Sequence, residues 1–341
     1  MDGAVRRINL ALQGGGAHGA FTWGVLDRLL EDEALEIAAI SGTSAGALNA
    51  AALKAGMIAG GRAGAKAMLD GLWARVGQVG DLRMVPWMQA WLPVARFWQD
   101  AAEAVMPISA QGIASQLYSP YAWGSAWENP LEPVVRGFDF SHVRAGDAPR
   151  LFISATNVRT GKIKVFQGPD ITPEALMASA CVPTVFQAVE IGGEAYWDGG
   201  YAGNPALFPL YDRDLPDDIV VVQVNPLRRD EVPDTPLEIQ NRINEISFNA
   251  SLLGELRAIN FVRRLIAQGR IERGVMKDVR VHLIADDRLM NRLTAATKLA
   301  PSPALLAELK AAGRAAAEVF LGHNRDRIGH EASADLVEMV T

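Results

Sequence analysis

The amino-acid sequence predicts an α/β protein built on a mainly parallel sheet. Short runs rich in β-branched residues alternate along the chain with alanine- and leucine-rich stretches of helical spacing, which is the pattern of strand–helix units in parallel sheets. The chain has 341 residues, of which 49% are hydrophobic and 21% are charged. It can therefore bury a large core, and it is neither disordered nor collagen-like.

The expected elements follow in chain order. The runs predicted as strands are residues 8–12, 36–40, 151–156, 162–166, 219–224 and 279–284. Helices are predicted at 19–31, at 45–56, at 173–180 and after Pro301. Three-and-four spacing also predicts a long amphipathic helix that packs over the sheet, through Ile239, Ile243, Ile246, Leu253, Leu256, Ile259, Val262 and Ile266.

A single domain over residues 1–341 is expected. It would comprise a core at about 8–209, C-terminal strands and helices at 210–330, and a frayed tail at 331–341. Residues 72–127 hold six of the eight tryptophans together with several prolines, so they are expected to form a helical insertion or cap. This insertion packs as a buried cap, touches a lipid interface or lines an acyl pocket.

Charge and cysteine content exclude several classes of protein. The 33 basic and 39 acidic side chains leave a formal charge of −6, which argues against nucleic acid as a partner. Cys181 is the single cysteine, so it cannot form an internal disulfide, and no spacing resembles a zinc site. The uncharged stretch 105–127 is interrupted by proline, glycine and serine, unlike a membrane span. A cytoplasmic protein, peripheral at a membrane at most, is expected.

A glycine-rich stretch at residues 13–19 follows the first predicted strand and opens the first helix. It matches Gly-x-Gly-x-x-Gly at Gly14, Gly16 and Gly19. In a nucleotide-binding oxidoreductase these glycines would let a pyrophosphate approach the helix N-terminus. However, Glu36 stands at the start of the second strand, where it cannot hold a ribose. This context disfavours the oxidoreductase, which stays an alternative.

Ser44 lies at a second strand-to-helix junction, within the pentapeptide at residues 42–46. A sharp turn there would lift the serine hydroxyl clear of the sheet, and it requires small residues such as Gly42 and Gly46. An ordinary helix cap is the alternative interpretation of Ser44. The two junctions together favour acyl transfer, because the glycine stretch can aim bare N–H groups and a helix dipole at an oxyanion.

Asp198 is the candidate base. None of the five histidines (His18, His142, His282, His323, His330) has a motif-like setting. Asp198 instead lies at a sharp turn with Gly199 and Gly200, after the apolar region 189–197. A dry pocket would raise its pKa from about 3.9 toward the working range. A structural turn aspartate is one alternative, and a Ser-His-Asp hydrolase using His282, His323 or His330 is another.

These three motifs, in this order, resemble the patatin-like phospholipase family. The resemblance covers roughly residues 8–209 and includes softer matches at 179–183 and at Asn204-Pro205. It implies a three-layer α/β/α sandwich and a Ser-Asp dyad, without histidine, that acts on acyl esters of lipids.

Carried over residue by residue, the resemblance makes Ser44 the nucleophile and Asp198 the base. The backbone N–H groups of Gly15, Gly16 and Ala17 would form the oxyanion hole. One departure is His18, which stands where many members carry arginine and could support the loop less strongly.

We therefore expect a serine lipid acyl hydrolase that acts on a lipid or fatty-acyl ester without metal or cofactor. A non-catalytic lipid-binding or interaction protein on the same fold is the remaining alternative. Contact with a membrane surface would be transient and mainly hydrophobic, because the net charge is negative,.

Overall fold

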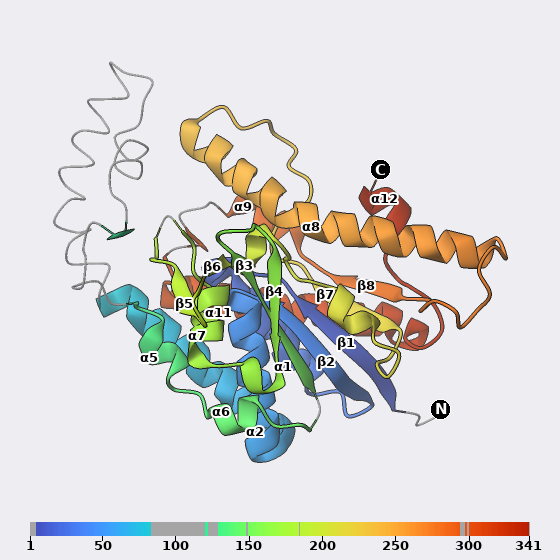
Figure 1. The fold of residues 1–341 in the computed structure, drawn as a ribbon, viewed down its shortest axis with the longest axis horizontal. Helices are drawn as coiled ribbons and strands as arrows, with labels where there is room; N and C mark the ends of the chain where they lie inside the picture. The colour runs from blue at the N-terminus through green and yellow to red at the C-terminus, as the bar shows by residue number, and fades with distance from the viewer. Residues whose placement is uncertain are drawn as a thin grey trace.

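Eight strands form one sheet in the part of the chain that the computed structural model describes, residues 5–82, 120–121, 129–147, 149–183, 185–293, 297–298 and 300–340. The strands are β1 (Arg6–Leu12), β2 (Leu35–Thr43), β3 (Arg150–Asn157), β4 (Ile163–Gln167), β5 (Val189–Ile191), β6 (Glu194–Asp198), β7 (Asp218–Val222) and β8 (Arg280–Ile284). Their order is β5-β6-β3-β2-β1-β7-β8, with β4 paired to β3. The adjacent strands β3, β2, β1, β7 and β8 pair in parallel. Strands β4 and β6 pair antiparallel with β3, and β5 pairs antiparallel with β6 (Figure 1).

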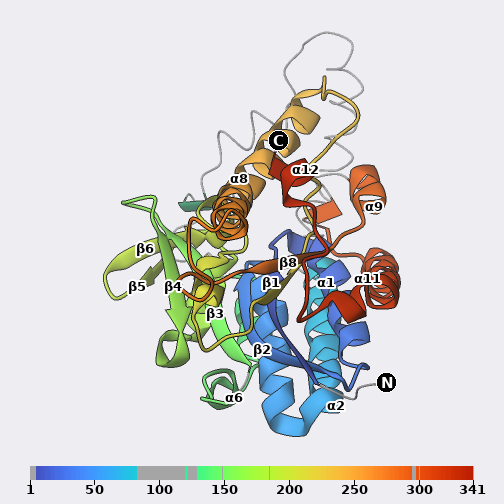
Figure 2. The same cartoon turned by 90° about the vertical axis from the view of Figure 1, so that its right-hand side faces the viewer.

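Helices cover both faces of this sheet. They are α1 (Gly19–Leu29), α2 (Ala45–Leu82), α5 (Glu132–Val135), α6 (Phe140–Val143), α7 (Pro173–Ser179), α8 (Pro236–Ala267), α9 (Asp287–Arg292), α11 (Pro303–Asn324) and α12 (Leu336–Val340). Successive side chains of a strand point to opposite faces. Accordingly, Leu10 of β1 joins a core shared with α1, α2 and α11, while the next residue, Ala11, joins a core shared with α8 and α12 (Figure 2).

The predicted α/β/α sandwich with a mainly parallel sheet is confirmed. All six predicted strands are present, within two residues of the expected start and three of the expected end. The short strands β5 and β6, which together span residues 189–198, were not predicted individually. Helix α2 is longer than expected: it continues to Leu82, past non-helical backbone at Gly60 and Gly61, and Gly61 has a φ of +61°.

Two expectations about domain organisation need correction. Residues 72–82, expected to begin the insertion, are the last turns of α2, and Leu72 and Trp73 are buried in the core. The rest of that expectation, residues 83–119 and 122–128, lies outside the described residues. At the other end, residues 331–341 were expected to fray, but α12 forms there and buries Leu336 against the core under α8. The single domain itself stays a prediction.

The long amphipathic helix is present as α8, but its N-terminal apolar residues do not pack on the sheet. Leu256 and Ile259 face the core as expected, but Leu252 is buried there in place of the predicted Leu253. In contrast, Ile239, Ile243 and Ile246 are 42%, 51% and 53% exposed. On the same helix, Glu245 and Asn249 are buried and hydrogen-bonded. Periodicity predicted the helix, but it did not identify its buried face.

The described helices include none with both the length and the apolar composition that crossing a bilayer requires.

Candidate active site

Ser44 lies in the turn between β2 and α2, at the carboxyl edge of the sheet. Its φ of +55° makes it the only non-glycine residue with positive φ in the described part of the chain. Such backbone strain is typical of a serine lifted out of a strand-to-helix turn. Its carbonyl oxygen accepts from the amides of Ala47 and Leu48, which begins α2. A Cβ atom at Gly46 would overlap the Leu12 carbonyl, so the tight turn requires glycine there.

Strand pairing places Asp198 beside this turn. Strand β2 occupies one edge of β3 as far as the pair Thr43–Ser154, and β4 occupies the other edge. β6 pairs with β3 from Ala155 onward, with Asp198 as the partner of Ala155. Since β4 pairs along one edge of β3, β6 must pair along the other edge, beyond the point where the pairing of β2 ends. The last residue of β6 therefore lies next to the Ser44 turn.

The Asp198 carboxylate is held inside the protein. It is 1% exposed and accepts a 2.7 Å hydrogen bond from the Gly200 amide. Its backbone carbonyl accepts from the Thr156 hydroxyl at 2.9 Å. Burial raises the pKa of Asp198 to about 6, although hydrogen bonds from the Gly200 amide and the Ser44 side chain act in the opposite direction. The Ser44 side chain is therefore close enough to Asp198 to act on its pKa, and burial moves that pKa toward neutrality, as a general base requires,.

The glycine loop at residues 14–19 lies against the same turn. A Cβ atom at Gly14 would be 2.6 Å from the Cβ of Ser44, so any side chain there would displace the serine. Gly16 adopts a φ of +59°, which glycine tolerates without strain,. Among the residues that the structure describes, none accepts a hydrogen bond from the amides of Gly15, Gly16 or Ala17. Within the described part of the chain, these three backbone donors therefore have no protein acceptor.

A buried amide network fixes the first residue of this loop. The Gly14 amide donates to Asn204 Oδ1 at 2.7 Å, and the Gly14 carbonyl accepts from Asn225 Nδ2 at 2.7 Å. Gln13 links the same asparagines to α8 by donating to Asn249 Oδ1 at 3.0 Å. Sequence reasoning noted Asn204 only as part of a soft family match, and it missed Gln13, Asn225 and Asn249.

A buried ion cluster supports the loop from the other side. Glu245 of α8 has a fully buried side chain that binds Arg229 at 2.6 Å, Arg242 at 3.4 Å and Lys298 at 3.8 Å. The Lys298 backbone carbonyl lies so close to Gly16 that a Cβ atom there would overlap it. Sequence reasoning missed this cluster, because Lys298 lies far along the chain from Glu245 and meets it only through tertiary packing.

His18 is buried behind the loop and is neutral. Its Nε2 atom lies 2.7 Å from the Thr297 hydroxyl. Burial, with the charges of Lys298 and Arg229, lowers the pKa of His18 to about 3. The imidazole therefore carries no charge that could support the glycine loop at neutral pH.

The alternative Ser-His-Asp arrangement is not assembled around Ser44. The His282 ring contacts Asp218 Oδ1 at 2.9 Å through Nε2 and the Ser333 hydroxyl at 3.0 Å through Nδ1. His323 lies on α11, where its Nδ1 atom contacts the carbonyl of the preceding turn. In the part of the chain that the structure describes, no histidine forms a hydrogen bond with Ser44.

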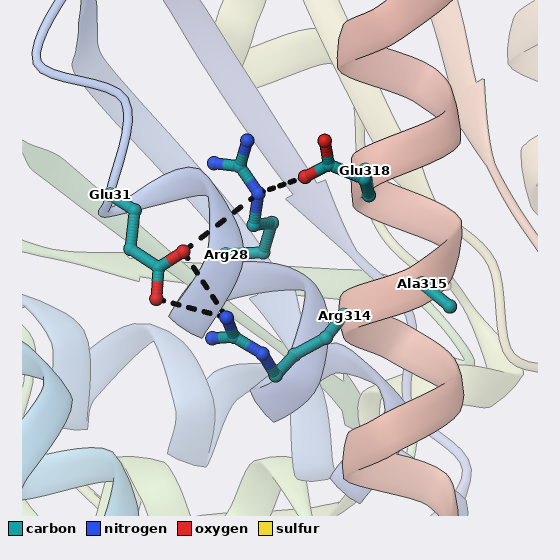
Figure 3. A pocket seen from close by; sticks show the side chains of 5 residues that line it. All are labelled: Arg28, Glu31, Arg314, Ala315 and Glu318. Atoms are coloured by element: carbon teal, nitrogen blue, oxygen red, sulfur yellow. Dashed lines mark hydrogen bonds and ion pairs between the residues drawn. The ribbon is translucent and has the colours of Figure 1, made fainter.

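Figure 3 shows a surface hollow between α1 and α11 that is separate from this site. It is lined by Arg28, Glu31, Arg314, Ala315 and Glu318. Arg28 pairs with Glu318, and Arg314 pairs with Glu31 at 3.0 Å. Because these opposite charges bind one another, the hollow braces two helices and offers no unmatched charge to a substrate. Nor does the described part of the chain gather three acidic, histidine or cysteine side chains that could hold a metal.

Comparison with known protein families gives a sequence match. Residues 10–211 match the family described as patatin-like phospholipase, whereas no curated protein matches. Among solved structures, VipD from Legionella pneumophila is similar at 16% identity and a TM-score of 0.42, over 93% of this chain and 67% of that chain.

Two structures of the ExoU–SpcU complex from the type III secretion system of Pseudomonas aeruginosa are also similar. Their identities are 16% and 18%, each with a TM-score of 0.32, over 93% and 95% of this chain. This chain spans 53% and 61% of those chains.

Proposed function

The chain belongs to the patatin-like phospholipase family, and on this premise we propose that it is a serine hydrolase of lipid acyl esters with a Ser44–Asp198 dyad. Membership of a phospholipase family supports lipid hydrolysis as the general function. One observation supports the dyad most strongly: the Ser44 side chain is close enough to the buried Asp198 carboxylate to act on its pKa, which burial raises to about 6. The amides of Gly15, Gly16 and Ala17, in the loop that packs on the Ser44 turn, have no acceptor among the described residues.

Acylation would proceed in two stages. Ser44 Oγ attacks the ester carbonyl carbon while its proton passes to Asp198, and the carbonyl π electrons move onto oxygen. The resulting oxyanion accepts hydrogen bonds from the amides of Gly15, Gly16 and Ala17, each typically worth about 3 kcal/mol of barrier in such a site. When the intermediate collapses, the C–O bond to the alcohol breaks, and Asp198 returns the proton to the leaving oxygen.

Deacylation would use the same groups in reverse. Asp198 takes a proton from a water molecule, whose oxygen attacks the acyl carbon of the Ser44 ester. The second tetrahedral intermediate occupies the same three amides. It then releases the fatty acid, and Asp198 returns its proton to Ser44 Oγ. The reaction thus needs one base that alternates between proton acceptor and donor, which a pKa near 6 permits.

Covalent labelling tests this proposal directly. A fluorophosphonate should modify the wild type at Ser44, the variant Ser44→Ala should not react, and Asp198→Asn should react at least about 100-fold more slowly. A parallel screen of fatty-acyl esters and phospholipids, varied in acyl length and headgroup, should show hydrolysis that disappears in Ser44→Ala. Lipid binding without labelling or hydrolysis would instead identify a non-catalytic lipid-binding protein.

We also propose that the enzyme touches lipid surfaces transiently and mainly through apolar side chains. Helix α8 crosses the candidate site, where Phe248 packs on Tyr201 with ring centroids 5.2 Å apart. The exposed residues Ile239, Ile243 and Ile246 lie on the same helix, and the net charge of −6 disfavours attraction to anionic lipid,.

Sedimentation with zwitterionic vesicles at two salt concentrations tests this contact. Binding should depend only weakly on salt and should fall in Ile243→Ser. Binding that disappears at high salt would contradict it. The cytoplasmic location stays a prediction.

A further inference from the structure

The C-terminal end of α7 contacts both residues of the proposed dyad. Helix α7 ends at Ser179, and the chain continues through Ala180 to Cys181. Both Ser179 and Cys181 are fully buried. The sequence indicated this segment only as a soft family match, with no role for either side chain.

Ser179 contacts the nucleophile. The Ser44 amide donates to the Ser179 hydroxyl oxygen over 2.9 Å. β2 ends at Thr43, so the Ser44 amide has left the strand and needs another acceptor. A buried amide without an acceptor bears its full desolvation penalty. The bond also acts on the residue whose backbone is strained, with a φ of +55°, so it restrains the orientation of the Ser44 side chain.

Cys181 contacts the base. Its carbonyl oxygen accepts from the Asp198 amide at 2.8 Å. Ser179 and Cys181 are separated by a single residue. They thus contact Ser44 and Asp198, which lie 154 positions apart. Distance and alignment between a nucleophile and its base decide how readily a proton moves between them.

We propose that Ser179 is a positioning residue for the dyad: its hydroxyl oxygen, by accepting the Ser44 amide, holds the nucleophile in line with Asp198. This inference rests on the proposed function. Ser179 itself neither exchanges a proton nor touches substrate.

Ser154 supplies a matched control. It is a serine of β3 that pairs with Thr43 at the base of the turn, and it is also fully buried. Among the described residues its hydroxyl has no hydrogen-bond partner. Ser154→Ala therefore makes the same chemical change, at equal burial and close to Ser44, without removing a bond to the dyad.

The test compares wild type, Ser179→Ala, Ser179→Cys and Ser154→Ala, each normalised by fluorophosphonate titration of active sites. Ser179→Ala should lower kcat about 10- to 100-fold with KM unchanged, since misplacement of a reacting group has effects of this size. Ser179→Cys, which keeps a weak acceptor, should lie between Ser179→Ala and wild type. Ser154→Ala should match the wild type.

The pH profile separates positioning from a merely structural role. The Ser44 hydrogen bond lowers the pKa of Asp198, so loosening that bond in Ser179→Ala should move the acidic limb of kcat/KM to higher pH. In the part of the chain that the structure describes, the titratable groups that interact with Asp198 are Cys181 and Tyr201, and burial raises the pKa of each to about 12. Both stay neutral over this range, so the limb reports on Asp198.

Three results would overturn the inference. The first is a wild-type kcat in folded Ser179→Ala, and the second is an equal loss of kcat in Ser154→Ala. The third is a Ser179→Ala protein with fewer active sites that react with the fluorophosphonate but with an unchanged acidic limb of kcat/KM. If Ser179→Ala does not fold, wild-type turnover by Ser179→Cys overturns it equally. Failure of the proposed function is a different outcome, because the wild type itself would then show no hydrolysis that depends on Ser44.

Discussion

Replacing Asp198 by asparagine should abolish activity and yet stabilise the folded protein above neutral pH. Burial raises the pKa of this carboxyl from its ordinary value of 3.8 to about 6, so folding favours the protonated form. A group of this kind contributes stability that is fully present below pH 3.8 and is lost as the pH rises through about 6,. Asparagine resembles the neutral carboxyl, keeps an acceptor for Gly200, and does not titrate.

The magnitude follows from the pKa difference. The interval from 3.8 to about 6, at 1.36 kcal/mol per pKa unit, corresponds to about 3 kcal/mol at high pH. The linkage relation assigns about 2 kcal/mol of this to the range between about pH 4.5 and about pH 8. Other titrating groups are shared by both proteins, so they cancel in the comparison.

Urea unfolding of wild type and Asp198→Asn at these two pH values measures the effect. The advantage of the variant should grow by about 2 kcal/mol at the higher pH. Ser44→Ala is the matched control, since it is also inactive but keeps the titrating carboxyl. Because it removes a group that lowers the pKa of Asp198, its stability should fall with pH at least as steeply as that of the wild type,. An equal difference between wild type and Asp198→Asn at both pH values would refute a buried, destabilised carboxylate.

Three further predictions concern the same site. The wild-type kcat/KM should fall as the pH drops below about 6, because Asp198 must be ionised to accept a proton,; a rate that increases toward lower pH would assign it the opposite role. Ser44→Gly should be more stable than Ser44→Ala by about 1 kcal/mol in urea unfolding, because only glycine adopts the positive φ without strain,; equal stabilities would mean that the turn is unstrained. Glu245→Gln should destabilise the fold by about 3–5 kcal/mol, since it leaves Arg229, Arg242 and Lys298 without their buried counter-charge,; a loss under about 1 kcal/mol would show a solvated cluster.

The sequence predicted the parts of the site that depend on local geometry. Gly14, Ser44 and Asp198 each lie where a strand ends in a tight turn, and such turns require glycine or small residues at fixed spacing. These positions are therefore visible in the sequence itself. The parallel strand pattern then brings the ends of β1 and β2 to one edge of the sheet, which is why the Ser44 turn and the glycine loop could be expected to meet.

The supporting contacts could not be predicted in this way. Gln13 bonds to Asn249 across 236 positions, and Glu245 binds Lys298 through tertiary packing alone. A polar side chain in a helix gives no local sign of whether it will be buried and paired. For the same reason the spacing in α8 predicted a helix but assigned Ile239, Ile243 and Ile246 to the wrong face.

A crystal structure of the fluorophosphonate adduct tests the convergence of nucleophile, base and amide loop most directly. The adduct should be on Ser44 Oγ, with its phosphoryl oxygen within hydrogen-bond distance of at least two of the amides of Gly15, Gly16 and Ala17, and with the Asp198 carboxyl beside the modified oxygen. An adduct on another residue, or a phosphoryl oxygen directed away from all three amides, would contradict the account.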